Sequence, residues 1–308
     1  MSGALDLTGR VAVVTGSGRG LGRAYAIALA AAGAAVVVND LDEDGARETV
    51  AAIADAGGRA VAEVAAVGES DVAQALVGLA RSEFGRLDLM CTNAGVLRDR
   101  VLWKMTDEDF DLVIETHLRG TFTCARAAVV ALREQGEGGR IIVVGSPAGQ
   151  RGNFGQTNYA AAKAGIAAFA RTWALELARS AVTVNAIVPT AWTAMTASIP
   201  AYAPLLERVA RGEGLPTLVR QEHAVGMPED CAGLIVFLAS DAAAAISGQC
   251  IGIGGDRLSL WSHPAELVFE LREGGWSAEQ IAERWPAAFA PAQQSYGIEF
   301  APLDAGES

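Results

Sequence analysis

Two side chains suited to proton transfer lie four residues apart near the middle of the sequence. Tyr159 and Lys163 share one face if this stretch is helical, because residues i and i+4 are neighbours on a helix. A free phenol titrates at about 10 and is a poor base at neutral pH, but a nearby ammonium stabilises the phenolate and lowers its pKa. Ser146, at the end of a β-branched run, would hold a substrate oxygen. Alone, the Tyr/Lys pair is a common helix-surface pattern, so its interpretation depends on its neighbours.

A glycine-rich segment near the N-terminus predicts an anion site. Thr15-Gly-Ser-Gly-Arg-Gly-Leu-Gly22 follows a strand-like run and precedes a helical pattern. Glycines let the backbone approach a pyrophosphate, and the free N–H groups at the start of a helix attract it. The segment alone could be a simple tight turn. Asp40, however, ends the second strand-like run at the spacing expected of a ribose-binding acid, and the combination predicts a dinucleotide site.

The choice of dinucleotide depends on two residues of opposite charge. The Asp40 carboxylate accepts hydrogen bonds from ribose hydroxyls and repels a 2′-phosphate, which favours NAD. Arg19, in the glycine-rich segment, would pair with that phosphate and favour NADP. We expect NAD, with NADP less favoured. The alternative for Asp40 is a helix N-terminal acid.

Short apolar runs alternate with helical patterns along most of the chain. Such alternation is typical of an α/β domain with a mostly parallel sheet covered on both faces. The expected strands are Val11–Val14, Ala35–Val38, Ala60–Val64, Leu87–Cys91, Ile141–Val144, Val182–Val188 and Cys250–Ile253. The expected helices lie near Gly22–Ala32, Glu43–Ala56, Val72–Phe84, Thr106–Arg133 and Tyr159–Arg179.

Two regions lie outside this alternation. Residues 190–228 contain several prolines and many apolar side chains, including Trp192, Met195, Ile199, Tyr202, Leu205 and Leu206, which predicts a substrate lid or, alternatively, added core. Residues 256–308 extend beyond a catalytic domain of residues 1–255. In this extension Ser262 and Pro264 predict a helix up to Gly274, and the Ser277-Ala-Glu-Gln280 capping box predicts a second helix that stops at Pro286. The extension as a whole is expected to be either an elaboration of the surface or, alternatively, a subunit contact or a pocket wall.

Composition and charge exclude several classes of protein. The net charge of −12 argues against nucleic-acid binding, because phosphate contacts need a basic face. No apolar run fits a membrane span or a secretory signal. The four scattered cysteines predict packed thiols in a reducing compartment, hence a cytoplasmic protein, and the three distant histidines predict no metal site.

The combination of TGSGRGLG, Asn93-Ala94-Gly95, Ser146 and Tyr159-x-x-x-Lys163 resembles the short-chain dehydrogenase/reductase family over residues 8–255. This resemblance implies one Rossmann-type doubly wound domain with a seven-stranded parallel sheet, assembled as a tetramer or dimer. It implies hydride transfer between nicotinamide and a secondary alcohol or carbonyl carbon. Tyr159 would then be the general acid/base, and Lys163 and the cationic nicotinamide would both lower its pKa. Lys163 would also bind the nicotinamide ribose, and Ser146 would position the substrate oxygen.

The cofactor-binding set follows from the same resemblance. Asn93 and Gly95 would line the adenosine ribose and the strand end, and Pro189 and Thr193 would flank the nicotinamide amide. The full set is Gly16, Ser17, Arg19, Gly20, Leu21, Gly22, Asp40, Leu41, Val67, Asn93, Ala94, Gly95, Tyr159, Lys163, Pro189 and Thr193. The motifs VNDL, LRDR, HLRG and GNFGQTNY resemble a narrower branch, which contains the (3R)-hydroxyacyl-CoA dehydrogenase domain of peroxisomal multifunctional enzyme type 2 and its bacterial relatives.

Three positions depart from the family pattern. His117 stands where most members have an Asn that completes a proton relay, so it is either a substitute relay residue or a packed one. Ala65-Ala66-Val67 replaces the acid that usually meets adenine, which leaves the contact to backbone near Val67. Thr190 replaces the glycine that usually follows Pro189, which implies a stiffer entry to the 190–228 segment.

We therefore expect an NAD-linked oxidoreductase for a hydrophobic secondary alcohol, with a 3-hydroxyacyl thioester as candidate substrate. One alternative is a dehydrogenase or reductase of a free alcohol such as a steroid or terpenoid. A remote alternative is a regulatory or scaffold protein that binds the cofactor without turnover. We expect a homo-oligomer, no nucleic-acid partner and no metal.

Overall fold

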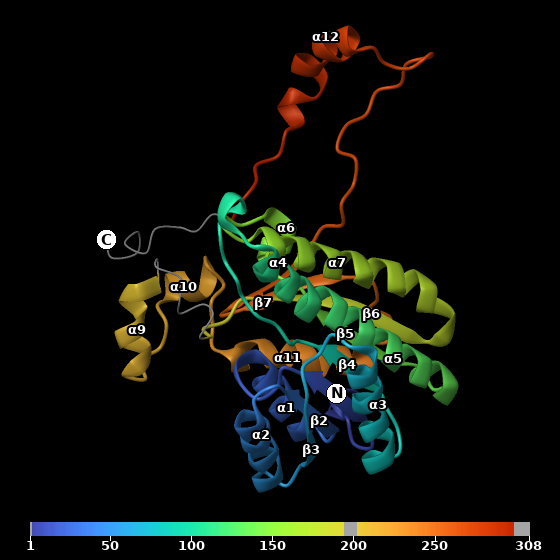
Figure 1. Cartoon of the computed structure of the whole chain (residues 1–308), viewed down its shortest axis with the longest axis vertical. Helices are drawn as coiled ribbons and strands as arrows, with labels where there is room; N and C mark the ends of the chain where they lie inside the picture. The colour runs from blue at the N-terminus through green and yellow to red at the C-terminus, as the bar shows by residue number, and fades with distance from the viewer. Residues whose placement is uncertain (1, 194–201, 299–308) are drawn as a thin grey trace.

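Eight strands form a single sheet in the computed structural model, which describes residues 2–193 and 202–298 (Figure 1). They are β1 (Val11–Thr15), β2 (Ala35–Asp40), β3 (Arg59–Val64), β4 (Leu89–Thr92), β5 (Gly139–Val144), β6 (Val182–Pro189), β7 (Cys250–Gly254) and β8 (Arg257–Trp261). Their order is β3-β2-β1-β4-β5-β6-β7-β8. The first seven strands are parallel and confirm the predicted architecture; β8 pairs antiparallel with β7.

Helices connect successive parallel strands, and a further helix follows β8. They are α1 (Gly20–Ala31), α2 (Glu43–Asp55), α3 (Ser70–Phe84), α4 (Asp107–Val113), α5 (Gly120–Gln135), α6 (Pro147–Arg151), α7 (Thr157–Leu177), α9 (Ala203–Ala210), α10 (Thr217–Gln221), α11 (Pro228–Ala239) and α12 (Ala278–Ala288). The single helix predicted over Thr106–Arg133 is wrong in detail. A π-helical segment, Ile114–Arg119, separates α4 from α5.

Both faces of the sheet are buried, as the continuous apolar strands require. In β5, Ile142 packs into the cluster on the α1 and α11 face, whereas Ile141 and Val143 pack into the cluster beneath α3, α5 and α7. Because side chains alternate along a strand, a strand covered on both sides must be apolar at every position. This burial fixes the carboxyl ends of β1, β4, β5 and β6 along one edge of the fold, where ligands of such sheets bind.

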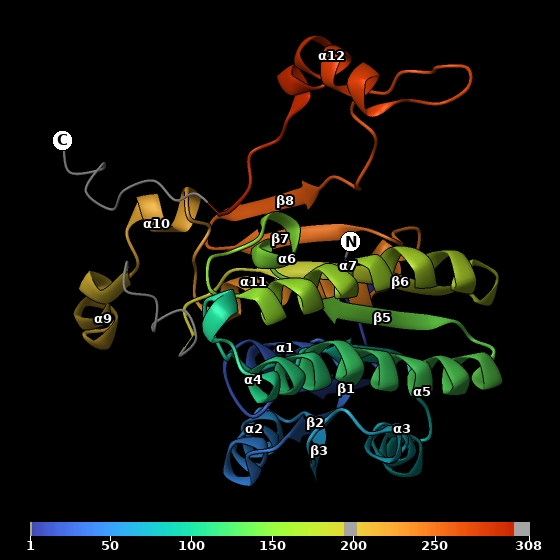
Figure 2. The same cartoon turned by 45° about the horizontal axis from the view of Figure 1, so that its top comes forward.

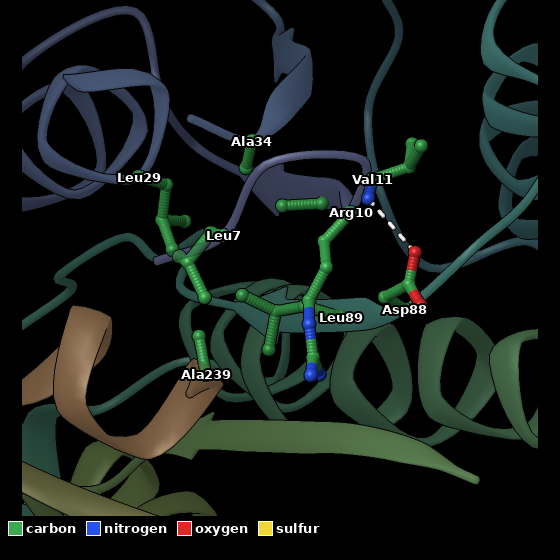
Figure 3. A pocket seen from close by; sticks show the side chains of 9 residues that line it. Leu7, Arg10, Val11, Leu29, Ala34, Asp88, Leu89 and Ala239 are labelled. Atoms are coloured by element: carbon green, nitrogen blue, oxygen red, sulfur yellow. Dashed lines mark hydrogen bonds between the residues drawn. The ribbon is translucent and has the colours of Figure 1, made fainter. Parts of the chain in front are cut away.

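The opposite edge, at the amino ends of the strands, is tightly closed (Figure 3). The Asp88 carboxylate accepts a hydrogen bond of 2.9 Å from the backbone N–H of Val11, which ties the starts of β4 and β1 together. The cavity beside Leu7 and Leu89 measures about 10 Å³, room for no more than about one water molecule. This edge is therefore a structural closure with no room for a substrate.

The segment after β6 forms a small cluster of its own. Trp192, Tyr202, Leu205, Leu215, Val219 and Val225 are buried together and belong to neither of the two clusters that cover the sheet. Met195 and Ile199 lie outside the described residues. Of the apolar side chains predicted to form a lid, Trp192, Tyr202 and Leu205 belong to this cluster, whereas Leu206 is 43% exposed.

The C-terminal extension begins with a strand that the sequence analysis missed. β8 alternates, with Leu258 and Leu260 exposed on one side and Ser259 and Trp261 half-buried on the other. A period of two is the signature of a half-covered strand. Residues 262–277 then contain no helix, so the predicted first helix is wrong. The side chains of this stretch have little to pack against, and a short helix without packing is marginal in water.

α12 projects away from the body at the end of a long excursion (Figure 2). Its Ser277 capping box with Gln280 is present as predicted, and a bidentate ion pair from Arg284 to Glu270 holds it to the outgoing chain. The helix continues through Pro286 to Ala288, contrary to the predicted stop. A proline three residues from a helix end removes only one backbone hydrogen bond, and Phe289 N still donates to Trp285 O at 3.0 Å.

Candidate active site

The turn between β1 and α1 adopts a backbone that requires glycine. Gly16 has φ of 63° and Gly20 has φ of 54°. A β-carbon on Gly16 would lie 2.6 Å from the α-carbon of Ala94, and one on Gly22 would overlap the carbonyl oxygen of Gly16. Arg19 precedes α1 and makes no side-chain cap, so the N–H groups of the first helical turn, including that of Leu21, remain available to an anion.

Ser17 supports this turn from inside. Its hydroxyl donates to Val14 O at 2.7 Å and accepts from Asn39 N at 3.1 Å, and its own N–H donates to Asn39 O at 2.8 Å. Both polar groups of Ser17 therefore have partners within the chain. The sequence placed Ser17 in the cofactor set; the structure uses it to join the turn to β2.

Asp40 ends β2 beside the same turn. Its Oδ2 accepts a 2.8 Å hydrogen bond from Gly18 N, and its Oδ1 accepts one of 3.1 Å from Asp42 N. The helix-capping role that was the alternative for Asp40 belongs to Asp42, whose side chain accepts from Gly45 N. Asp40 is thus a carboxylate held next to the turn. Leu41 is 73% exposed and Arg19 is exposed as well, so both lie at the rim of this region.

The end of β4 is joined to the turn by a polar network. Asn93 Nδ2 donates to Thr15 O and Gly16 O, both at 3.0 Å. Thr15 Oγ1 accepts from the backbone N–H groups of Asn93 and Ala94 at 3.0 and 3.1 Å. Thr15, which the sequence analysis did not single out, thereby aligns the two strand ends. Val67 packs close to Gly120, where a β-carbon would lie 2.8 Å from its Cγ2.

The structure brings Ser146, Tyr159 and Lys163 together. Ser146 follows β5 and caps α6 by accepting from Ala148 N at 3.2 Å, and its side chain hydrogen-bonds that of Tyr159. Lys163 is buried; its Nζ donates to Val144 O at 2.6 Å and lies 5.5 Å from the centre of the Tyr159 ring. The predicted i, i+4 pair therefore shares one face of α7 and meets the end of β5.

Burial shifts the pKa values of Tyr159 and Lys163 in the protein alone. Burial raises the pKa of Tyr159, although its hydrogen bond with Ser146 opposes the change. Burial also lowers the pKa of Lys163 to about 7. In the protein alone desolvation is the largest effect on the Tyr159 pKa, and Lys163 Nζ is directed to the Val144 carbonyl; the expected lowering by Lys163 together with an oxidised nicotinamide stays a prediction.

His117 lies in the π-helical segment and contacts Tyr159 edge to face, with ring centres 5.1 Å apart. Its Nε2 lies 3.0 Å from N and 2.8 Å from O of Val96. Burial, with a smaller contribution from the charge of Lys163, lowers the pKa of His117 to about 3, so the ring is neutral at physiological pH. Its Nδ1 is buried and has no hydrogen-bond partner among the described residues.

Asn158 is a positioning residue that the sequence analysis missed. It is fully buried, its Nδ2 donates to Arg98 O at 3.1 Å and Asp109 O at 2.9 Å, and its Oδ1 accepts from Tyr159 N at 2.7 Å. These bonds hold the start of α7 against the chain after β4. Asn158 stands directly before Tyr159, and its buried amide bonds could be recognised only once the loops were placed.

The segment after β6 is tied down at the positions predicted to flank nicotinamide. Thr190 N donates to Ile253 O at 2.9 Å, and Trp192 N donates to Gly226 O at 2.6 Å. Pro189 and Thr193 bracket this stretch, and the Thr193 methyl would lie 3.7 Å from a β-carbon on Gly20. The structure therefore brings the segment after β6 to the start of α1.

This edge of the sheet fits a dinucleotide. At one end, the start of α1 has no side-chain cap, and the glycine-rich turn leaves a space next to the Asp40 carboxylate that a β-carbon would fill. At the other end lie Tyr159 and Lys163. Among residues 2–193 and 202–298, no cluster of three or more His, Cys, Asp or Glu could hold a metal, and no helix is long and apolar enough to cross a membrane. All four cysteines are buried free thiols.

Comparison with known proteins gives a family match. Residues 10–202 match the family described as short chain dehydrogenase. The chain is 42% identical over 254 residues to the short-chain reductase protein NovJ of Streptomyces niveus, covering 80% of this chain and 93% of that protein. It is 42% identical over 289 residues to the hydroxyacyl-CoA dehydrogenase ChsB1 of Mycobacterium tuberculosis, covering 90% and 87%.

Two further similarities bear on the branch and on the extension. The chain is 47% identical over 206 residues to peroxisomal multifunctional enzyme type 2 of Drosophila melanogaster, covering 64% of this chain but only 34% of that longer protein. A crystal structure of a short chain dehydrogenase from Mycobacterium avium superposes with a TM-score of 0.81 at 33% identity, covering 96% of this chain and 99% of that one. The C-terminal extension therefore has a structural counterpart.

Proposed function

Because the chain belongs to the short-chain dehydrogenase family, and is thus an oxidoreductase that acts on CH–OH groups with a nicotinamide dinucleotide, we propose that it interconverts a hydrophobic 3-hydroxyacyl thioester and its 3-oxo counterpart. The observation that carries the proposal is the meeting of Ser146, Tyr159 and Lys163 at the end of β5, on the edge that also presents the glycine-rich turn.

The catalytic side chains act on the substrate oxygen and its proton. When bound, the nicotinamide accepts or donates the hydride. The Ser146 hydroxyl holds the substrate oxygen. The Tyr159 phenolate takes the proton of the alcohol in oxidation, and the Tyr159 phenol returns a proton in reduction. Positioning by these two groups supplies much of the rate. Burial raises the pKa of Tyr159, so the positive charge of an oxidised nicotinamide and of Lys163 would have to offset desolvation.

Lys163 and His117 are proposed to relay the proton between Tyr159 and solvent. Lys163 Nζ would bind the nicotinamide ribose and pass a proton onward. His117 would take the relay position that Asn fills in most of the family. The observation that supports this role is the Nδ1 atom of His117. This atom is buried, in a ring that contacts Tyr159, and it has no hydrogen-bond partner in the described part of the chain.

We assign NAD as the cofactor in preference to NADP. The Asp40 carboxylate is held by two backbone N–H groups beside the glycine-rich turn, where it would meet the adenosine ribose and repel a 2′-phosphate. Arg19 is exposed and could turn toward that phosphate, which is the opposing argument. The buried free thiols support a reducing compartment such as the cytoplasm.

The substrate class rests on relatives and on the apolar lid. One relative is named a hydroxyacyl-CoA dehydrogenase and another, of Synechocystis, a 3-oxoacyl-[acyl-carrier-protein] reductase. The Trp192 cluster beside the nicotinamide end would supply an apolar wall and exclude water. On this proposal residues 190–228 are protected from hydrogen exchange once cofactor and substrate bind; equal protection in both states would make them a fixed element.

The test is a panel of substrates assayed in both directions. NADH formation is followed with 3-hydroxyacyl thioesters, steroid alcohols and terpenoid alcohols, and NADH consumption with the matching ketones. A kcat/KM for thioesters about tenfold or more above that for free alcohols is the expected result. Preference for free alcohols would favour the alternative substrate class. Dinucleotide binding without turnover of any member would favour a regulatory protein.

A further inference from the structure

A cavity of about 300 Å³ opens beside the catalytic serine, on the α6 and α7 face of the sheet. Pro147, directly after Ser146, lines one side. Val188 and Thr190, on either side of Pro189, line another. The cavity, here called the side chamber, therefore adjoins both the residue proposed to hold the substrate oxygen and the segment proposed to flank nicotinamide.

The floor of the side chamber is made by the strand pair that ends the sheet. Gly252 of β7 has no side chain, and a β-carbon there would overlap Ser259 Oγ and lie 3.0 Å from Trp261 Nε1. Ser259 and Trp261 come from β8 and both line the chamber. The Trp261 Nε1–H is buried and donates to no partner within the described ranges. The floor thus combines the apolar ring of Trp261 with the hydroxyl-bearing Ser259.

The returning C-terminal chain closes the other side. Gly297 N donates to Arg151 O at 2.7 Å, Arg151 Nε donates to Gly297 O at 3.3 Å, and an Arg151 Nη donates to Ser295 Oγ at 2.8 Å. Gly297 and Ile298 both line the chamber. Residues 295–298 are therefore fastened to α6, and the extension forms a wall of this cavity.

The rim carries cationic groups without carboxylate partners. Arg257, exposed at the start of β8, and Arg151 make no ion pair in the part of the chain that the structure describes. Glu222 is the opposing charge on the same rim. The neighbouring Arg220, by contrast, is paired with Asp230 and Asp256. Two unpaired guanidinium groups on one rim fit a phosphate, which accepts charge-assisted hydrogen bonds.

We propose that the side chamber binds the phosphopantetheine arm of an acyl thioester, with its phosphate at Arg257 and Arg151. This inference rests on the proposed function, because it takes the thioester carbon to lie near Ser146. The arm contains amide groups and a gem-dimethyl group, which match a chamber whose lining is partly apolar and partly hydrogen-bonding. Coenzyme A and a carrier protein share this arm.

The experiment compares 3-hydroxyacyl thioesters that carry the same acyl group on coenzyme A, on 4′-phosphopantetheine, on pantetheine and on a carrier protein. We expect the two small phosphorylated forms to have KM values about tenfold below that of the pantetheine form, the gain of about one charge-assisted contact. Arg257→Ala should raise KM for the phosphorylated forms about tenfold with little change in kcat. Arg257→Lys should recover part of the loss, and the pantetheine form should be unaffected.

Arg179→Ala is the matched control, since Arg179 is exposed beyond the far end of α7 and should leave every KM unchanged. A higher kcat/KM for coenzyme A than for the carrier protein identifies the free thioester as the source, and the reverse identifies the carrier; either agrees with the proposal. Equal KM values with and without the phosphate, in a protein that still oxidises the thioesters, would overturn the side chamber and leave the proposed function intact.

A second measurement does not require turnover. Calorimetric titration of the protein with 4′-phosphopantetheine should show binding that Arg257→Ala weakens about tenfold. If no alcohol or thioester is oxidised but 4′-phosphopantetheine still binds, the proposed function is contradicted and the proposed binding site in the side chamber is supported. Absence of binding in the wild-type protein would overturn the chamber.

Discussion

The imidazole of His117 lies against the α-carbon of Gly95, so closely that a β-carbon on Gly95 would overlap Cε1 and lie 3.0 Å from Nδ1. The two residues come from the end of β4 and from the π-helical segment. The glycine is therefore required by the histidine that faces it, because no side chain at position 95 could share this space with an imidazole.

We expect Gly95→Ala to lower the free energy of unfolding by about 1–3 kcal/mol, as overpacking does. Combining it with His117→Asn should recover part of that loss, because the smaller side chain vacates the space. Denaturant unfolding of both variants measures the coupling. Gly78→Ala in α3 is the control, since nothing lies within 4 Å of its β-carbon position, and it should stabilise the helix by about 0.5–1 kcal/mol. Additive losses would contradict direct contact.

Tyr159→Phe keeps the ring but removes the transferable proton. We expect kcat to fall about 10²-fold or more while the dinucleotide dissociation constant stays nearly unchanged. Steady-state kinetics and fluorescence titration give the two quantities. Tyr25→Phe is the control, because the Tyr25 hydroxyl is buried in the core without a hydrogen-bond partner in the described residues. Activity of Tyr159→Phe within about threefold of wild type would remove Tyr159 from the mechanism.

Asp40→Ala should narrow or reverse a preference for NAD over NADP in kcat/KM. The change removes a carboxylate that repels a 2′-phosphate, and also the hydrogen bond that Gly18 N donates. Asp42→Ala, which loses the cap of α2 but leaves Asp40 in place, should keep the preference. A wild-type preference for NADP would show that Arg19 dominates.

Lys163 makes stability depend on pH in a defined direction. Burial lowers its pKa from 10.5 to about 7, so between these values the unfolded chain binds more protons than the folded one. The free energy of unfolding gained from this residue therefore rises with pH, by at most about 1.4 kcal/mol per pH unit. Urea unfolding between about pH 7 and 8.5 should show the free energy of unfolding of the wild-type protein rising with pH relative to that of Lys163→Met. This range is chosen because the cysteines of the unfolded chain ionise mostly above it. Parallel curves for the two proteins would contradict it.

The exposed face of α7 carries small and apolar residues, from which we predict a homo-oligomer. Ala161, Ala164 and Ala168 are exposed, and Leu175 is 82% exposed. Small residues permit close helix approach, so we expect a homotetramer or homodimer in light scattering, a multiple of 31.8 kDa. Ala168→Glu should lower the mass, whereas Ala54→Glu on the exposed side of α2 should not. A wild-type mass near 31.8 kDa at micromolar concentration would refute assembly through this face.

The sequence predicted those parts of the molecule that depend on local patterns. The seven parallel strands follow from apolar runs such as Val11–Thr15, and the meeting of Tyr159 with Lys163 follows from helical spacing. The contact of Gly95 with His117 depends on where a π-helical segment lies, and periodicity does not contain that information.

Two failures have the same physical origin. The helix predicted near Pro264 had acceptable end signals but no packing surface, and the single helix predicted over Thr106–Arg133 is interrupted by a π-helical segment. Both depend on what surrounds a residue in three dimensions. The side chamber was missed for that reason as well, since β7, α6 and Gly297 are far apart in the sequence.

The two sides of β8 face different surroundings, because Ser259 and Trp261 line the side chamber while Leu258 and Leu260 face outward, 68% and 67% exposed. A neighbouring subunit that covered the two leucines would rest on the same strand that shapes the chamber floor. Association and thioester affinity would then be thermodynamically linked, and each would change the other by the same factor. We expect the dissociation constant for a thioester to change with protein concentration. A dissociation constant that is the same for the monomer and the assembled protein would show that the two sides of β8 act separately.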